Sequence, residues 1–284
     1  MKITDDYPPK SDDGLLVEDV HAWAEEKYRL VQHYSSLFCK SMRRKWESLV
    51  YIDLFSGPGR SRIDHKRIID AVPLLVTNTD CLYDKYIFCD VSVEKCDALK
   101  QRIERQAITT NFEILNGDAN VVSQDILRLI PPHNRQHRVL GFCFIDPYKI
   151  ANLQFETIRT LSNRFIDFLV LIPTGMDANR NESQYTKPKN KKLDVFLGAS
   201  DWRREWRIAK AQGESFEPFV AKQFSKNMQR LGYLDPGFEN MKPVMSVEKN
   251  LLLYRLALYS KHPLGTKFWK DTVEYTQLQR RLDI

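Results

Sequence analysis

Apolar residues in this chain fall into two patterns, continuous runs and helical periods. Residues 49–55 form a run of aliphatic and aromatic side chains interrupted only by Asp53, which is typical of a strand covered on both faces. In the preceding segment, from residue 17 to about residue 46, apolar positions recur at steps of three and four, the period of an amphipathic helix. The first elements predicted are therefore a helix and then a buried strand.

The same alternation continues as far as residue 172. Further strands are predicted at 86–90, 112–115, 139–145 and 166–172, and helices at 93–105, 119–130 and 155–163. Strands that alternate with helices form mostly parallel sheets through right-handed crossovers. We therefore expect an α/β fold with helices on both faces of the sheet.

The last third of the chain departs from this alternation. Residues 175–210 are polar and basic and lead to a predicted helix at 216–231. Two apolar runs at 241–247 and 251–260 flank Glu248-Lys249-Asn250, which indicates a hairpin, and a final helix is predicted at 266–278. A parallel sheet that ends in an antiparallel hairpin is the strand plan of the Rossmann-like methyltransferase fold.

The predicted elements divide the chain into three parts. Residues 1–46 form an N-terminal arm and helix, and residues 47–174 and 236–284 form the methyltransferase-like core. Residues 175–235 form a basic helical insertion that could contact a substrate or a partner.

Composition narrows the class of protein. The 284 residues contain no apolar run long enough to cross a membrane, and the N-terminus lacks the basic and apolar segments of a signal peptide. We therefore expect a cytoplasmic protein. The five cysteines are odd in number and form no Cys-x-x-Cys pair, so reduced thiols are expected, without a disulfide framework or a zinc site. The histidines show no metal-ligand spacing, and no metal is assigned.

The strongest candidate for a binding site follows the first strand. In Asp53-Leu54-Phe55-Ser56-Gly57-Pro58-Gly59, the glycines allow a ligand to approach the backbone, and Asp53 can accept a hydrogen bond from an ammonium group. A third glycine at position 62 would complete the dinucleotide motif, but the residue there is Arg62. The loop, including Phe55 and Ser56, therefore favours a nucleoside ligand without a pyrophosphate; an ordinary strand-to-helix turn is the alternative.

Acidic residues also follow the next two strands. Asp90 stands where a carboxylate pairs with ribose hydroxyls, and Asp118, followed by Ala119, stands where one could bond an adenine amino group. Either aspartate could instead cap the helix that follows it. Because three successive strands end in acidic residues, we favour a shared binding role.

The fourth candidate is Asp146-Pro147-Tyr148, after the strand at 139–145. Asp146 and the carbonyl of Pro147 could accept the protons of an exocyclic amine and localise its lone pair for methyl transfer. Tyr148 could stack on an extruded base. The stretch has one proline where the usual Asp-Pro-Pro-Tyr motif has two, and Asp-Pro is also a common turn.

A basic stretch in the insertion is a candidate for nucleic-acid contact. The net charge of +6 permits an anionic partner. The residues proposed to contact phosphates are Lys187, Lys189, Lys191 and Lys192, with Arg180, Arg203, Arg204 and Arg207 nearby. Trp202 and Trp206 could provide stacking platforms beside them. A solvated loop is the alternative.

Taken together, these segments resemble the three-Cys-motif partner proteins (TcmP). The resemblance rests on the segments 23–27, 33–34, 51–59, 117–120, 144–148 and 259–263, which occur in this order and are spread over most of the chain. It implies a Rossmann-like methyltransferase domain, S-adenosylmethionine as cofactor, and a partner that carries the three cysteines and resembles radical S-adenosylmethionine enzymes. The family pattern has Ala, Glu and Gly where this chain has Ser56, Asp90 and Lys149, so the mouth of the substrate site is expected to differ.

The resemblance also implies a functional role for individual residues. By resemblance, Asp53, Gly57 and Gly59 form the cofactor loop, Asp90 binds ribose, Asp118 binds adenine, and residues 146–148 are catalytic. The predicted function is methyl transfer from S-adenosylmethionine to an exocyclic amine, such as a base in DNA or RNA. An inactive scaffold or cofactor-binding subunit on the same fold is the alternative. A nucleotide- or NAD-dependent enzyme is disfavoured because the third glycine and a Gly-Lys-Ser/Thr loop are absent.

Overall fold

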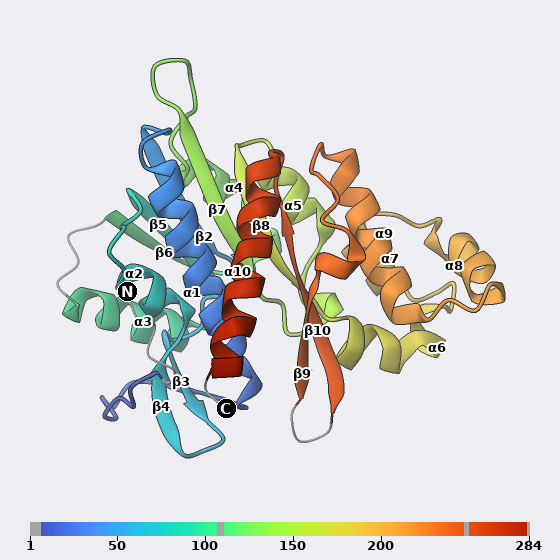
Figure 1. The fold of residues 1–284 in the computed structure, drawn as a ribbon, viewed down its shortest axis with the longest axis horizontal. Helices are drawn as coiled ribbons and strands as arrows, with labels where there is room; N and C mark the ends of the chain where they lie inside the picture. Colours follow the sequence, from blue (N-terminus) through green and yellow to red (C-terminus); the bar gives the residue numbers. More distant parts are fainter. Residues whose placement is uncertain (1–6, 107–110, 247–249, 283–284) are drawn as a thin grey trace.

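A mixed sheet of seven strands forms the centre of the molecule (Figure 1). The computed structural model describes residues 7–106, 111–246 and 250–282. In spatial order the strands are β6 (Asn111–Asn116), β5 (Lys85–Asp90), β2 (Ser48–Asp53), β7 (Val139–Ile145), β8 (Ile166–Ile172), β10 (Leu251–Tyr259) and β9 (Lys242–Ser246). The first five are mutually parallel, whereas β10 runs antiparallel to both β8 and β9. The predicted fold class is confirmed.

Helices cover both faces of this sheet. One face carries α1 (Trp23–Met42), α2 (Val72–Thr77), α3 (Val93–Arg105) and α10 (Pro263–Leu282). The other carries α4 (Ala119–Leu129), α5 (Phe155–Leu161), α6 (Glu182–Tyr185), α7 (Lys192–Leu197), α8 (Trp202–Ala211) and α9 (Phe216–Arg230). Single turns of helix lie at Ile150–Asn152, Thr174–Ala178, Asn179–Asn181 and Phe238–Asn240. In Figure 1, α1 and α10 lie in front of the sheet, with α4 and α5 behind it.

The alternation of side chains along each strand explains why the central strands are mostly apolar. In β2, Leu49 and Tyr51 point into the core beneath α1, whereas Val50 and Ile52 point into the core beneath α4 and α5. All four side chains are fully buried. A parallel strand with helices on both faces has no solvent-facing side, which is why its sequence is a continuous apolar run.

The N-terminal arm ends in a second, small sheet that the sequence analysis did not predict. Strand β1 (Glu18–Val20) pairs in parallel with β3 (Arg60–Ile63), which forms a hairpin with β4 (Arg67–Asp70). The prediction of a helix from residue 17 was therefore wrong, because residues 18–20 pair with this hairpin. The hairpin turn lacks glycine, and its residues Asp64 and His65 adopt positive φ angles of 45° and 58°. The usual turn signal was thus absent.

The other predicted elements agree closely with the structure. The strands at 139–145 and 166–172 and the helix at 93–105 have the predicted bounds, and the helix predicted at 266–278 spans Pro263–Leu282. The C-terminal antiparallel hairpin is present, although its turn residues Glu248 and Lys249 lie outside the described residues. No described helix is long and apolar enough to cross a membrane.

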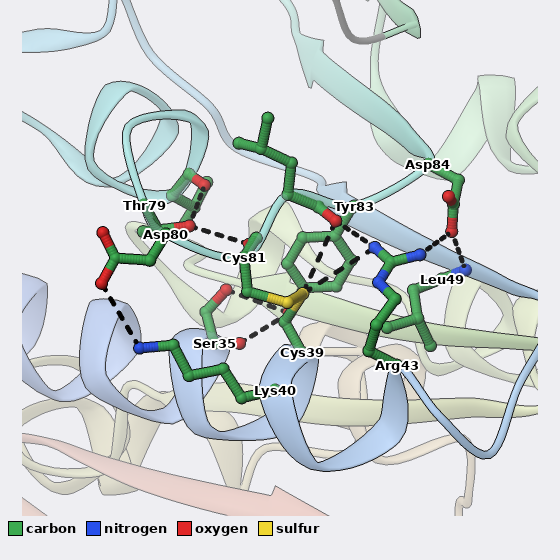
Figure 2. The surroundings of a disulfide bond; sticks show 12 residues. Ser35, Cys39, Lys40, Arg43, Leu49, Thr79, Asp80, Cys81, Tyr83 and Asp84 are labelled. Atoms are coloured by element: carbon green, nitrogen blue, oxygen red, sulfur yellow. Dashed lines mark hydrogen bonds and ion pairs between the residues drawn. A yellow bond between two sulfur atoms is a disulfide. The ribbon is translucent and has the colours of Figure 1, made fainter.

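The prediction that all cysteines are reduced was wrong. Cys39 on α1 and Cys81, in the loop after α2, form a disulfide (Figure 2). The two residues are 42 positions apart in the sequence, so no local cysteine spacing predicts the disulfide. The packing of α2 on α1 brings them together. Cys89, Cys96 and Cys143 are free and buried, as expected for core thiols.

Polar contacts surround this disulfide and fasten the loop to α1. Arg43 donates to the carbonyl of Leu82 and forms an ion pair with Asp84 at 2.6 Å. Asp84 also accepts from the backbone N–H of Leu49 at 2.7 Å, so one network joins α1, the loop and the start of β2.

Reduction of the disulfide is expected to lower the free energy of unfolding by roughly 2–4 kcal/mol, because it removes a crosslink across a long loop of the unfolded chain. Denaturant unfolding of the wild type with and without dithiothreitol measures this difference. The Cys81→Ser variant serves as the control and should show no response to dithiothreitol. Equal stability of oxidised and reduced wild type would contradict the expectation.

Candidate functional site

A cleft of about 780 Å³ opens at the carboxyl ends of the central parallel strands. Its lining includes all four aspartates predicted to share a site: Asp53 at the end of β2, Asp90 at the end of β5, Asp118 after β6 and Asp146 after β7. Carboxyl ends of parallel strands lie at one edge of a sheet, and the reversal of strand order there leaves space for a ligand. The volume lies within the usual range for small-molecule sites.

Asp53 lies at the bottom of this cleft, with 1% of its surface exposed. Its Oδ1 accepts the backbone N–H of Phe55 at 3.1 Å, and its Oδ2 accepts from the hydroxyl of Tyr51 at 3.4 Å. Burial raises the pKa of Asp53 to about 8; the Phe55 N–H and Lys27 oppose this rise, and Asp146 adds to it. A ligand cation next to Asp53 would stabilise its ionised form.

The loop after β2 is held by hydrogen bonds to its neighbour strand. Ser56 N–H donates to the carbonyl of Cys89 at 2.9 Å, and Gly57 N–H donates to Oδ2 of Asp90 at 3.0 Å. Two segments predicted separately to bind one ligand are thus directly bonded to each other. Phe55 and Ser56 line the cleft, whereas Gly57 and Gly59 are not among its lining residues.

The two glycines of this loop are required for its backbone conformation. Gly57 and Gly59 have φ angles of +63° and +83°, a region that favours glycine. A Cβ atom on Gly59 would lie 2.8 Å from Cδ1 of Leu99, so its absence also lets the loop pack closely on α3. The glycines therefore set the path of the loop, and the atoms that face the cleft come from neighbouring residues.

The sequence left open whether Asp90 and Asp118 bind a ligand or cap a helix, and the structure gives a different answer for each. The cap of α3 is Ser92, whose hydroxyl accepts from Lys95 N–H at 3.3 Å, so Asp90 is not that cap. Asp118 does cap α4 through the N–H of Asn120 at 2.9 Å, and it also lines the cleft beside Ala119.

Asp146 faces the cleft in a direct ion pair with a lysine from α1. The Nζ atom of Lys27 donates to Oδ2 of Asp146, and the side chains of Lys27 and Asp146 are 8% and 21% exposed. Tyr148 also lines the cleft and is 65% exposed, whereas Pro147 is buried and is not among the lining residues. The structure therefore places two members of the predicted catalytic segment at the cleft.

Aromatic and aliphatic side chains line the cleft near Asp146. The rings of Trp23 and Tyr254 lie 5.2 Å apart, and the lining residues Met176 and Leu253 add further apolar surface. Such walls suit a flat ring ligand.

The sequence analysis missed Lys27, Trp23 and Tyr254 as site residues. Lys27 did carry a signal, because it falls on the buried stripe of α1, three positions after Ala24 and four before Val31. A charged residue on an apolar stripe is rarely buried without a partner. Trp23 and Tyr254 reach the cleft only through tertiary packing of α1 against the C-terminal hairpin.

The basic stretch of the insertion lies apart from the cleft lining. Lys187, Lys189, Lys191 and Lys192 are exposed and are not lining residues, whereas Arg180 is both. Lys191 pairs with Asp194 at 3.4 Å and Lys187 bonds Gln184. A role of these lysines in nucleic-acid contact stays a prediction.

The proposed stacking role of two tryptophans was wrong. Trp202 and Trp206 are 1% and 3% exposed, and the Trp206 ring lies 4.9 Å from that of Phe216. They form the apolar stripe of α8 and belong to the core. Arg203 is likewise engaged, in an ion pair with Asp194. Within the described ranges, no group of three or more His, Cys, Asp or Glu side chains could hold a metal ion.

Among known proteins, only solved structures are similar to this chain. No family model and no curated protein matches the chain. Protein LPL1258 of Legionella pneumophila str. Philadelphia 1, family-model DUF519, is similar at 11% identity and a TM-score of 0.48, over 87% of this chain and 91% of that one. The O-methyltransferase from Bacillus cereus in complex with SAH is similar at 13% identity and a TM-score of 0.43, over 87% and 85%.

A third similar structure is a putative O-methyltransferase from Klebsiella pneumoniae, at 8% identity and a TM-score of 0.42, over 84% of this chain and 88% of that one. At these identities the functions of the matched proteins are not transferred. The fold class itself follows from the strand order, with antiparallel β10 between β8 and β9. The observed sheet, mostly parallel with a C-terminal antiparallel hairpin, has the strand plan predicted from the sequence for a Rossmann-like methyltransferase fold.

The variant Asp53→Asn is expected to be more stable than the wild type at pH 8, by roughly 5 kcal/mol, and about equal to it near pH 4. The pKa of Asp53 is raised to about 8, so its proton stabilises the folded state at low pH, and this contribution is lost as the pH rises through about 8. Asparagine mimics the protonated form at every pH. Denaturant unfolding between pH 4 and pH 9 measures the difference.

Asp167 provides a positive control for this experiment, because it is a buried carboxyl group outside the cleft. Burial raises the pKa of Asp167 to about 7, a rise opposed by the Ser260 hydroxyl, and Asp167 is not among the cleft lining. Asp167→Asn should therefore also stabilise the protein at pH 8. A loss of stability in Asp53→Asn at pH 8 would contradict this account of Asp53.

Proposed function

We propose that this protein is an S-adenosylmethionine-dependent methyltransferase that acts on an exocyclic amine, such as that of a base in DNA or RNA. The observation that carries the proposal is the single cleft lined by Asp53, Asp90, Asp118 and Asp146. Four carboxylates from four neighbouring strand ends provide hydrogen-bond acceptors for an ammonium group, ribose hydroxyls and an amino group. The sequence has no Gly-Lys-Ser/Thr loop that would bind a phosphate.

The residues present fit this cofactor. The buried Asp53 is mostly protonated at neutral pH, and a ligand ammonium would supply the charge that ionises it. Asp90 keeps acceptor capacity beyond its bonds from Gly57 N–H and Ser92 N–H, because each carboxylate oxygen has two lone pairs. Asp118 is exposed at the far side of the cleft, within reach of a polar ligand edge.

Methyl transfer requires an acceptor whose lone pair is available. When bound, S-adenosylmethionine supplies a methyl group on a sulfonium, which passes to an attacking nitrogen while the C–S electron pair stays on sulfur. The Asp146 carboxylate accepts a hydrogen bond from the amine, draws its lone pair out of the ring and can take up the proton that the methylated nitrogen loses. Trp23, Tyr148 and Tyr254 supply ring faces against which a base can stack.

A partner and a nucleic-acid surface are further parts of the proposal. The motifs at 51–59 and 144–148 support membership of the TcmP family and, with it, pairing with a three-Cys-motif protein. Arg180 at the cleft and the exposed lysines at 187–192 would contact phosphates of DNA or RNA.

One observation favours the alternative of a non-catalytic binding subunit. Lys27 already bonds Asp146, the carboxylate that the reaction needs. A scaffold could retain the fold, the cleft and the cofactor and use them only to hold a partner enzyme.

Asp146→Ala is expected to reduce methyl transfer about 100-fold or more, because the acceptor amine loses its hydrogen-bond acceptor. The assay measures transfer of a labelled methyl group from S-adenosylmethionine to DNA and RNA from a host that lacks this gene, with the three-Cys-motif partner present. Asp125→Ala, an exposed aspartate on α4, is the matched control and should keep full activity. Equal activity of Asp146→Ala and wild type would contradict a catalytic role.

Asp53→Asn is expected to weaken binding of S-adenosylmethionine about tenfold or more, since a charge-assisted hydrogen bond is lost. Calorimetric titration measures the dissociation constant, and Asp167→Asn should bind as tightly as the wild type. Unchanged affinity in Asp53→Asn would exclude contact between Asp53 and the ligand ammonium.

A further inference from the structure

Lys27 is a buried cation at the reacting end of the cleft. Its side chain is 8% exposed, and its Nζ atom lies 5.4 Å from the ring centroid of Trp23 and 5.5 Å from that of Tyr28. Burial by itself would lower the pKa of Lys27, but Asp146 opposes this and the net effect raises the pKa. The side chain is therefore a permanent positive charge.

The charges around Lys27 come from three other elements. Asp146 follows β7, Asp53 ends β2 and Glu18 lies on β1. Asp53 is mostly neutral at pH 7, because burial raises its pKa to about 8, and Glu18 forms an ion pair with Lys95 at 2.8 Å. Lys27 and Asp146 thus form a charged pair of their own, and the side chain of Lys27 in it is buried.

The geometry leaves half of the Asp146 carboxylate available. Lys27 bonds Oδ2, and among the described residues no hydrogen-bond donor contacts Oδ1. A carboxylate fixed through one oxygen presents the other in a defined direction, as a residue that receives an amine proton must.

Stability does not explain this pair. Removing a lysine and a carboxylate from water costs several kcal/mol, and their attraction usually does no more than offset that cost. In other proteins, apolar residues of similar size often replace a buried ion pair with no loss of stability. A role in the site accounts for the pair.

We infer that Lys27 is a positioning residue that holds the Asp146 carboxylate through Oδ2, directs Oδ1 to the acceptor amine and balances the negative charge where the methyl group is transferred. The inference rests on the proposed function. If Asp146 binds the acceptor amine, the methyl group would have to be presented close to Asp146, and a bound sulfonium would then lie within the field of the Lys27–Asp146 pair. With both partners present that field is small.

Two single variants then have opposite effects on cofactor discrimination. Lys27→Met leaves an unbalanced carboxylate, which should favour the cationic S-adenosylmethionine over its neutral-sulfur product S-adenosylhomocysteine. Asp146→Asn leaves an unbalanced ammonium and should shift the same ratio the other way. We expect changes of about three- to tenfold in the ratio of dissociation constants, and the double variant should return towards the wild-type ratio.

The experiment is calorimetric titration of the full chain with S-adenosylmethionine and S-adenosylhomocysteine, which needs no methyl acceptor. The matched control is Lys242→Met, because Lys242 forms a buried ion pair with Glu26 on α1 at 3.0 Å and is not among the cleft lining. This control should leave the ratio unchanged. Lys27→Arg keeps the charge and should retain the wild-type ratio; together with Asp146→Asn it tests the proposal if Lys27→Met does not fold.

Opposite shifts in the two single variants, with recovery in the double variant, support the inference. Equal ratios in all variants, or shifts in the same direction, overturn it while leaving the proposed function in place. A wild type that binds neither compound refutes the proposed function and the inference with it.

Discussion

Parallel strands that end at one edge of a sheet are the constraint on which this site depends. Strand β2 lies between β5 and β7, and β5 lies between β2 and β6, so the residues at or just beyond the carboxyl ends of these four strands are neighbours although they are far apart in the sequence. Asp53, Asp90, Asp118 and Asp146 each occupy such a position, and all four line one cleft. Hydrogen bonds between the loops, such as that from Gly57 N–H to Asp90, fix this edge further.

Holding carboxylates at this edge has an energetic cost that the rest of the chain offsets. Asp53 is fully buried and loses the hydration of its ionised form, as its raised pKa records. The aromatic core beneath α1, where Tyr51 packs against Phe88 and Phe142, supplies apolar contacts on the same strand. The charge at Asp146 is instead balanced locally, by Lys27 from α1. Two neighbouring carboxylates are thus accommodated in different ways, one by protonation and one by pairing.

Sequence patterns predicted the sheet well because burial on both faces leaves a clear signal. The continuous apolar strands were recognisable for this reason, as was the glycine-containing loop that follows the first of them at 53–59. The hairpin β3–β4 was not, since its turn uses Asp64 and His65 without glycine. The Cys39–Cys81 bond and the Lys27–Asp146 pair join residues through tertiary packing alone, and Trp202 looked like a surface platform because its basic neighbours mask the apolar stripe of α8. Carboxylates at strand ends could therefore be predicted, whereas their partners across the cleft could not.

The central claim is that four strand-end carboxylates form one site for an adenosyl ligand without a pyrophosphate. Calorimetric titration of the purified chain with S-adenosylmethionine, NAD and ATP in parallel tests it most directly. The account predicts saturable binding of one S-adenosylmethionine per chain and no binding of the two phosphate-containing ligands. Binding of NAD or ATP without binding of S-adenosylmethionine would contradict it.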